Sequence, residues 1–285
     1  MKRVNRIKEV RDLIAFTNRK PVGFVPTMGA LHMGHLSLAE AAVKACPEVV
    51  VSIFVNPTQF NDPEDLKNYP RNTKADLELL SPVLRGNDII FTPEVNEIYP
   101  EPDKRVFGFG DLEKVMEGAR RPGHFNGVAQ VVSKLFDIVK PDMAFFGQKD
   151  FQQLTIIKEL VRITGSNVKI ISCPIVREKD GLAMSSRNML LEPSIRKEAG
   201  IIFRTINSAA QRFFKSDIVS LKSEVSQAIN SLPGFALEYF EIADDVELKL
   251  LGSASGLIPG RKYYACIAVR AGKIRLIDNV EIPLV

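Results

Sequence analysis

The sequence predicts an α/β protein, with a Rossmann-like doubly wound parallel sheet followed by a smaller α+β domain. Up to about Val176, short apolar runs alternate with segments of helical periodicity. This order is typical of parallel strands joined by right-handed helical crossovers. Beyond Arg177 the order changes, because helical segments are followed by strand-like ones. We therefore predict a first domain over residues 1–176 and a second over residues 177–285.

The first domain is expected to open with a helix over residues 7–16. The segment VVVSIFV (49–55) is apolar on both faces, as a strand covered by helices on each side must be. Strands are predicted at residues 22–25, 49–55, 89–92, 143–146 and 168–173. Helices are predicted between them at residues 36–45, 73–80, 128–139 and 151–161.

In the second domain, apolar residues from Ile195 to Phe213 recur at helical spacing and predict one helix beginning at Pro193. A second helix, over residues 218–232, ends before Pro233 and Gly234. Strands are expected at residues 235–243, 263–270 and 273–277. The last two should form a hairpin around Ala271-Gly272.

Composition excludes several classes of protein. The 285 residues are 45% hydrophobic and carry a formal net charge of +4, without the block of Lys and Arg that nucleic-acid-binding arms contain. No apolar run approaches the ~20 residues of a membrane span, and the charged amino-terminal segment does not read as a signal peptide. The scattered cysteines Cys46, Cys173 and Cys266 suggest reduced thiols in a cytoplasmic protein.

The segment GFVPTMGALHMGH (23–35) is the strongest candidate for chemistry. A strand that is followed by a glycine-rich loop and the start of a helix makes an anion site, because the first helical N–H groups have no partner within the helix. His32 and His35 lie there, and Gly34 allows a phosphate to approach the backbone. The alternative is a surface or metal coincidence, although further zinc ligands at suitable spacing are missing.

Two further motifs follow predicted strands. In FVNPTQF (54–60), Asn56 and Gln59 could orient hydroxyl and carboxylate groups of a substrate, or could simply form a turn. In FGQKDFQQ (146–153), Lys149 could contact phosphate and Asp150 could accept from ribose hydroxyls, with Gln153 one turn into the helix. The alternative there is that Asp150 only caps the helix.

Two loops complete the set of candidate motifs. GLAMSSRN (181–188) combines hydroxyls with a guanidinium, which suits a departing polyphosphate, and its place between domains suits a closing lid. A solvated linker is the alternative. In RRPGHF (120–125), Arg121 and His124 either border the site or form a turn before the next helix.

These motifs together resemble pantothenate synthetases (pantoate–β-alanine ligases), of the HIGH-type nucleotidyltransferase superfamily. PTMGALHMGH, FVNPTQF, RPGHF, FFGQKDFQQL and GLAMSSRN occur in that family's order and rough spacing. The resemblance implies condensation of pantoate with β-alanine through a pantoyl-adenylate, consuming ATP with Mg²⁺ and releasing AMP and pyrophosphate. It also implies a homodimer.

The resemblance further assigns residues, position by position. Gln59 and Gln153 would hold pantoate, with Gln59 also near β-alanine, and His35 occupies the proton-donor position. As a separate mechanistic hypothesis, His32, His35, Lys149 and Arg187, with Mg²⁺, would stabilise charge on the α-phosphoryl group and the departing pyrophosphate, and Asp76 is a possible indirect Mg²⁺ partner. ATP would contact Met28, Gly29, Ala30, Leu31, His32, Met33, Gly34, His35, Gly147, Gln148, Lys149, Asp150, Val176, Met184, Ser185, Ser186 and Arg187.

Two alternative functions remain. A true nucleotidyltransferase would keep the nucleotide in its product. An RNA-binding or tRNA-charging protein should carry an anticodon-binding module or a basic arm, and neither is visible in the sequence.

Overall fold

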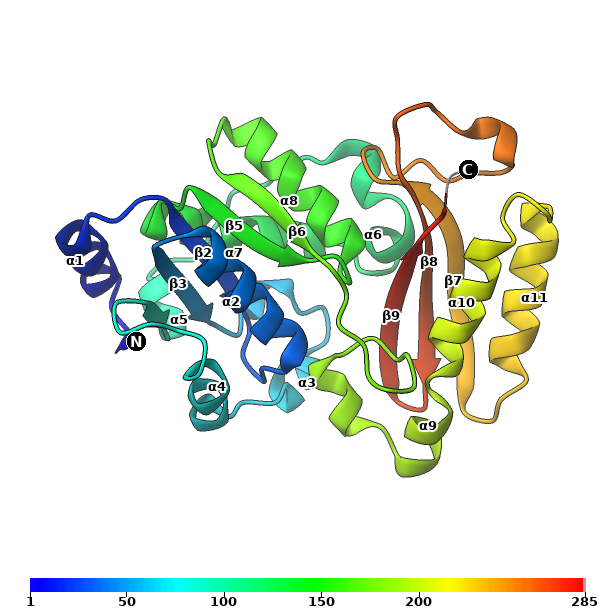
Figure 1. The fold of residues 1–285 in the computed structure, drawn as a ribbon, viewed down its shortest axis with the longest axis horizontal. Coiled ribbons are helices and arrows are strands. Elements are labelled where there is room, and N and C mark those ends of the chain that lie inside the picture. Colours follow the sequence, from blue (N-terminus) through cyan, green and yellow to red (C-terminus); the bar gives the residue numbers. More distant parts are fainter. Residues whose placement is uncertain (284–285) are drawn as a thin grey trace. The chain divides into compact units, whose positions relative to one another are not determined.

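The protein was analysed as a computed structural model, which describes residues 1–283. Contacts between residues divide it into two units, Met1–Gln148 with Ile156–Pro174, and Lys149–Thr155 with Ile175–Val285. The division lies close to the predicted one but groups Lys149–Thr155 with the second unit. Positions 284 and 285 of the predicted second domain lie outside the described residues. The first unit contains a parallel sheet and the second an antiparallel sheet, which confirms the predicted fold class (Figure 1).

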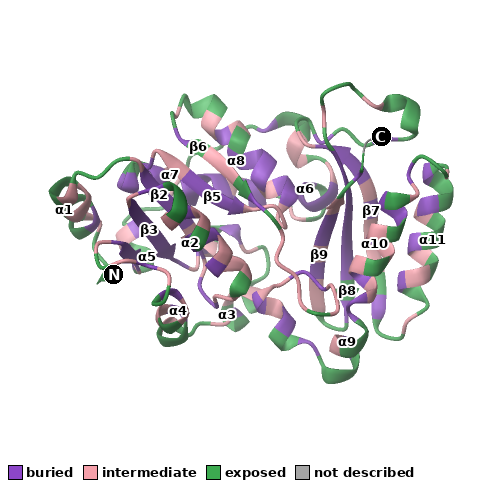
Figure 2. Ribbon diagram, in the orientation of Figure 1, coloured by how far each residue is buried: buried purple, intermediate pink, exposed green. Residues whose placement is uncertain are grey.

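The sheet of the first unit has the strand order β1-β4-β3-β2-β5-β6, with every neighbouring pair parallel. Its strands are β1 (Lys2–Val4), β2 (Val22–Thr27), β3 (Glu48–Ile53), β4 (Ile89–Phe91), β5 (Met143–Gly147) and β6 (Lys169–Cys173). Strand β1 was not predicted, because Lys2 and Arg3 are charged and no apolar run marks the segment. All six residues of β3 are buried (Figure 2), as expected for a strand covered on both faces.

Helices cover both faces of this sheet (Figure 1). Helix α2 packs on β2, β3 and β5, whereas α7 contacts β2 and packs against α1. The helices are α1 (Ile7–Thr17), α2 (Met33–Ala45), α3 (Pro63–Asn68), α4 (Thr73–Leu80), α5 (Val95–Ile98), α6 (Met116–Arg120), α7 (His124–Val139) and α8 (Phe151–Thr164). Helices α2 and α7 begin three and four residues earlier than predicted, so both include histidines of the candidate motifs. No helix described within residues 1–283 combines the length and hydropathy needed to cross a bilayer.

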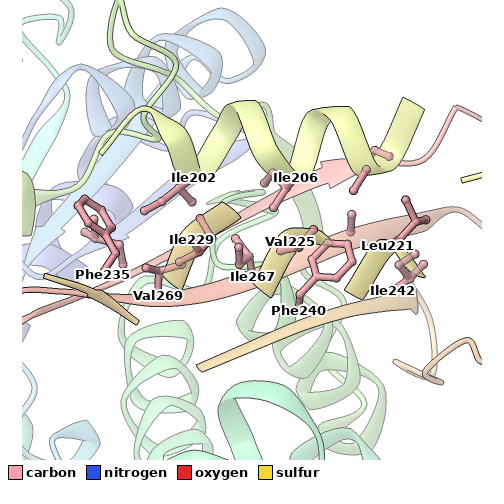
Figure 3. Packing of buried hydrophobic residues seen from close by; sticks show 14 of the residues in the cluster. Ile202, Ile206, Leu221, Val225, Ile229, Phe235, Phe240, Ile242, Ile267 and Val269 are labelled. Carbon is pink, nitrogen blue, oxygen red and sulfur yellow. The ribbon is translucent and has the colours of Figure 1, made fainter. Parts of the chain in front are cut away.

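The second unit is a three-stranded antiparallel sheet with helices packed on it. Strands β7 (Phe235–Asp244), β8 (Tyr263–Ala271) and β9 (Ile274–Glu281) lie in that order. The predicted hairpin is confirmed, since Ala271 pairs with Ile274 across a two-residue turn in which Gly272 has φ +60°. Helices α10 (Ile201–Gln211) and α11 (Ile218–Asn230) supply the apolar residues that pack against β7 and β8 (Figure 3).

The prediction of one continuous helix from Pro193 to Phe213 was wrong. The segment forms α9 (Pro193–Glu198) and α10, separated by Ala199 and Gly200. The backbone passes close to another segment at this point, because a Cβ on Gly200 would lie 2.6 Å from the carbonyl oxygen of Asp180. We attribute the interruption of the helix to this close approach, since the apolar residues keep the same helical spacing on both sides of Ala199 and Gly200.

One close approach in the first unit gives a stability prediction. A Cβ at Gly127 in α7 would overlap the carbonyl of Thr58, in the 3₁₀ turn Pro57–Gln59. We expect Gly127→Ala to lower the free energy of unfolding by about 1–3 kcal/mol, the usual cost of overpacking. Gly86→Ala is the control, since no atom lies within 4 Å of a Cβ there. Denaturant unfolding of both variants measures the difference, and equal stabilities would contradict the predicted overlap.

Candidate active site

The carboxyl ends of adjacent parallel strands bring the first candidate motifs together. Strand β2 pairs with β3 up to Thr27 and Ile53, and it pairs with β5 through Gly23 and Phe24. Loops that follow these three strands therefore leave the same edge of the sheet. Ligands of doubly wound sheets bind at this edge.

The loop after β2 is fixed by the carboxylate of Asp76, which lies in the first turn of α4. Its Oδ1 accepts the N–H of Leu31 at 2.7 Å and its Oδ2 accepts the N–H of Ala30 at 3.2 Å. The anchor holds a loop with unusual backbone angles, since Ala30 has φ +49° and Gly29 has φ +80°. A non-glycine residue in this region persists only when its surroundings hold it there.

Asp76 is 3% exposed, and burial raises the pKa of its carboxyl, although the two backbone hydrogen bonds oppose the shift. Both of its oxygens accept loop N–H groups in this structure. Within residues 1–283, no cluster of three or more His, Cys, Asp or Glu side chains could hold a metal ion. Anchoring the loop is thus the contact that Asp76 makes here.

His32, Met33, Gly34 and His35 form an HxGH motif at the start of α2, and the loop that carries it is called the HxGH loop. The two imidazoles lie side by side, with ring centroids 4.1 Å apart. Nδ1 of His32 accepts the N–H of Gly34 at 3.1 Å, and Nδ1 of His35 accepts the N–H of His32 at 3.3 Å. A neutral ring that accepts at Nδ1 carries its proton on Nε2. Each ring can therefore present Nε2–H as a donor at a helix amino terminus that already favours anions.

Gln59 lies beside this loop, as its Nε2 is 3.0 Å from the sulfur of Met28. The amide of Asn56 sets its orientation, donating from Nδ2 to Oε1 of Gln59 at 3.1 Å. The hydroxyl of Tyr99 donates to Oδ1 of Asn56 at 2.9 Å, which fixes that amide in turn. Gln59 therefore has its NH₂ group on the side of Met28.

Arg121 and His124 also contact Gln59, through its backbone. Nδ1 of His124 lies 2.7 Å from the Gln59 carbonyl oxygen, and Nη2 of Arg121 donates to the same oxygen at 3.5 Å. Of the two roles considered for this segment, the structure shows the turn before a helix, and a place at the border of the site stays a prediction. His124 begins α7, and its side chain supports the residue expected to hold pantoate.

The loop after β5 contributes Gly147 and Gln148. The N–H of Gln148 donates to the carbonyl of Cys173, and its Oε1 accepts from the hydroxyl of Ser172 at 2.6 Å. A Cβ on Gly147 would meet no atom within 4 Å, so open space borders the backbone here. Approach of a ligand at this glycine stays a prediction.

The remaining candidates belong to the second unit. Nζ of Lys149 lies 3.6 Å from Oδ1 of Asp150, and the Lys149 side chain is 20% exposed. Its backbone carbonyl accepts a hydrogen bond from Nδ2 of Asn279 at 3.0 Å. Gln153 is half-buried in α8, a helix that begins in the second unit and continues into the first.

The loop GLAMSSRN (181–188), here named the MSSR loop, is held by backbone hydrogen bonds within the second unit. The N–H of Met184 donates to the carbonyl of Val176 at 3.0 Å. Ser185 caps the 3₁₀ turn Ser186–Leu190, since its hydroxyl accepts the N–H of Arg187 at 3.3 Å. Val176 is thus joined to the segment that carries Arg187.

The predicted site residues are grouped in two sets, each within its own unit. The first contains the HxGH loop with Gln59, Asp76 and Gly147, and the second contains Lys149 with the MSSR loop. Sequence reasoning missed Tyr99 and Asn279. No sequence signal marked Tyr99, and Asn279 lies beyond the strand predicted at residues 273–277, whereas β9 extends to Glu281.

Comparison with known proteins assigns the family. The profile described as Pantoate-beta-alanine ligase matches residues 2–281. A protein of Azobacteroides pseudotrichonymphae named pantothenate synthetase is 51% identical over 261 residues, covering 92% of each chain. The pantothenate synthetase of Bacteroides thetaiotaomicron is 48% identical over 283 residues, covering 99% of each chain.

Solved structures give the same result. Pantothenate synthetase from Thermus thermophilus superposes with a TM-score of 0.90 at 41% identity, covering 99% of each chain. Pantoate-beta-alanine ligase from Francisella tularensis, complexed with beta-gamma ATP and beta-alanine, has a TM-score of 0.82 at 35% identity, covering 100% of this chain and 99% of its own. The protein therefore belongs to the pantoate–β-alanine ligase family.

Proposed function

We propose that the protein condenses (R)-pantoate with β-alanine to form pantothenate, using ATP through a pantoyl-adenylate and releasing pyrophosphate and AMP. The observation that carries this proposal is the Asp76-anchored HxGH loop, with two imidazoles at a helix start and the Gln59 amide beside Met28. That the Francisella tularensis relative is complexed with beta-gamma ATP and beta-alanine supports these two substrates.

In the first step, a carboxylate oxygen of pantoate attacks the α-phosphorus. The bond from that phosphorus to the bridging oxygen breaks, and pyrophosphate leaves with the electron pair. No base is needed, so the protein's task is positioning and stabilisation of charge. His32 and His35 would donate from Nε2 to phosphate oxygens, with His35 as the proton donor, and Lys149 and Arg187 would supply positive charge.

Mg²⁺ fits this site as an ion carried by the nucleotide. The carboxylate expected to help hold it, that of Asp76, already accepts two backbone hydrogen bonds. Mg²⁺ commonly keeps several waters and binds through substrate phosphates with one or two carboxylates. When bound, it would neutralise charge on the phosphates, and a contact with Asp76 would be indirect.

In the second step, the amine of β-alanine attacks the acyl carbon of the adenylate. The C–N bond forms, the C–O bond to AMP breaks, and the amine loses a proton. Gln59 and Gln153 would hold the pantoyl group, and Gln59 would also lie near the amine. Residues 1–176 would bind nucleotide and pantoate, while the loop at 181–188, in the domain of residues 177–285, would exclude water from the anhydride.

A homodimer in the cytoplasm completes the proposal. Sedimentation of the purified protein measures the oligomeric state, and fractionation of cells measures the compartment.

The reaction itself is tested by isotope exchange. With pantoate and ATP but no β-alanine, we expect labelled pyrophosphate to enter ATP, because adenylate formation is reversible. Adding β-alanine should then release AMP, and chelation of Mg²⁺ should stop both reactions. Nucleotide retained in the final product would indicate a nucleotidyltransferase. Tight, steeply salt-dependent RNA binding would indicate the nucleic-acid alternative.

Lys149→Ala tests stabilisation of the transition state. We expect the exchange rate to fall by about 100-fold, a typical loss when a donor to developing charge is removed. The KM for ATP should change by less than about threefold, since the interaction strengthens only as charge develops. Lys158→Ala, at an exposed position of the helix α8 that follows Lys149, is the control. Equal losses in rate and in ATP affinity would contradict this role.

Asp76→Asn tests the loop anchor. An asparagine keeps one acceptor oxygen but turns an NH₂ group toward a backbone N–H, so the loop should lose its fixed position. Hydrogen bonds to charged groups contribute about 1.5–3 kcal/mol, so we expect the KM for ATP to rise by about tenfold or more. Asp12→Asn, exposed on α1, is the control. Full recovery in excess Mg²⁺ would instead support a role through the metal.

A further inference from the structure

Two adjacent polar residues of β9, Asp278 and Asn279, are both buried. They are 3% and 2% exposed, and they face opposite sides of the sheet because side chains alternate along a strand. Buried polar groups carry a cost unless hydrogen bonds satisfy them. Their bonding partners therefore indicate what each residue does.

On one face, Asp278 holds the start of the loop that leads to Arg187. Both of its oxygens accept from Arg177, at 2.6 and 3.0 Å, and Arg177 also donates to the carbonyl of Gly181 at 3.1 Å. The guanidinium carbon lies 3.9 Å from the centre of the Phe203 ring. This contact fixes the base of the loop against the sheet and α10.

On the other face, Asn279 holds Lys149. Its Nδ2 donates to the Lys149 carbonyl at 3.0 Å, which fixes the peptide plane directly after Lys149. Two residues later, the ring of Phe151 packs on Tyr264 of β8, with centroids 4.6 Å apart. Lys149 and Asp150 are thus held between two contacts with the same sheet, and the direction in which the Lys149 side chain leaves the backbone is set by them.

We propose that Asn279 is a positioning residue for adenylate formation, acting by holding the backbone of Lys149. This inference rests on the proposed function, in which the ammonium of Lys149 stabilises phosphoryl charge. Misplacing a catalytic group by about 1 Å can cost about 100-fold in rate, so a hydrogen bond to the backbone of that group can affect catalysis without touching substrate.

The test is Asn279→Ala in the full-length protein, assayed by pantoate-dependent pyrophosphate exchange and by thermal unfolding. We expect the exchange rate to fall by about tenfold, with the KM for ATP within about twofold of wild type, as expected when only transition-state stabilisation is lost. Asn230→Ala is the matched control. Asn230 lies in the same unit and bonds Ser226 and Leu237, and its removal should leave the rate within about twofold.

A double-mutant cycle separates positioning from a general structural effect. In a Lys149→Ala background, Asn279→Ala should change the rate by less than about twofold, because the group that it positions is gone. A loss by the same factor in both backgrounds would overturn the proposal. So would a control variant that loses as much activity as Asn279→Ala.

Failure of the inference is distinguishable from failure of the proposed function. Wild-type protein without pantoate-dependent exchange would contradict the function itself. Active wild-type protein with an equally active Asn279→Ala variant would overturn only the positioning role. Should Asn279→Ala not fold, Asn279→Leu keeps the side-chain volume without the donor and should show the same loss of rate. Loss of fold in both variants would make Asn279 structural and overturn the proposal.

Discussion

The parallel register between β2 and β3 is the constraint on which the first unit's site depends. Six consecutive pairs, from Val22 with Glu48 to Thr27 with Ile53, end both strands at one edge of the sheet. The HxGH loop and the turn carrying Gln59 therefore begin side by side. Burial of every β3 residue makes a slip of this register costly, since both faces of the strand are already packed. Contacts such as that of Gln59 with Met28 follow from this arrangement.

Features that depend on neighbouring residues in the sequence were predictable. Apolar runs predicted strands β2 to β6 of the parallel sheet, and the glycine-rich loop before α2 indicated the candidate anion site. Features set by contacts distant in sequence were not. The bond of Asp76 to Leu31 joins residues 45 apart, and the break before Gly200 depends on the carbonyl of Asp180. The grouping of Lys149 with the second unit depends on β9, more than a hundred residues later in the chain.

The candidate residues of the two units differ in their chemistry. The first offers hydrogen-bond donors, namely the amide of Gln59 and the Nε2 atoms of His32 and His35, whose Nδ1 atoms already accept backbone N–H groups. The second carries the cations Lys149 and Arg187. Neutral donors discriminate by geometry, because each must meet an acceptor at a fixed place. Cations add strength to the binding of a polyphosphate.

The turn between β8 and β9 determines which way Asp278 and Asn279 face, because the side chains of a strand alternate between its two sides. Pairing of Ala271 with Ile274 sets which residue of β9 lies opposite each residue of β8. A shift of β9 by one residue toward its carboxyl end would put Asp278 in the place of Asn279, facing Lys149, and Ile277 in the place of Asp278, facing Arg177, so that Arg177 would lose its carboxylate partner. An insertion or deletion in this hairpin would therefore act as an active-site change, although no residue of the turn belongs to the site.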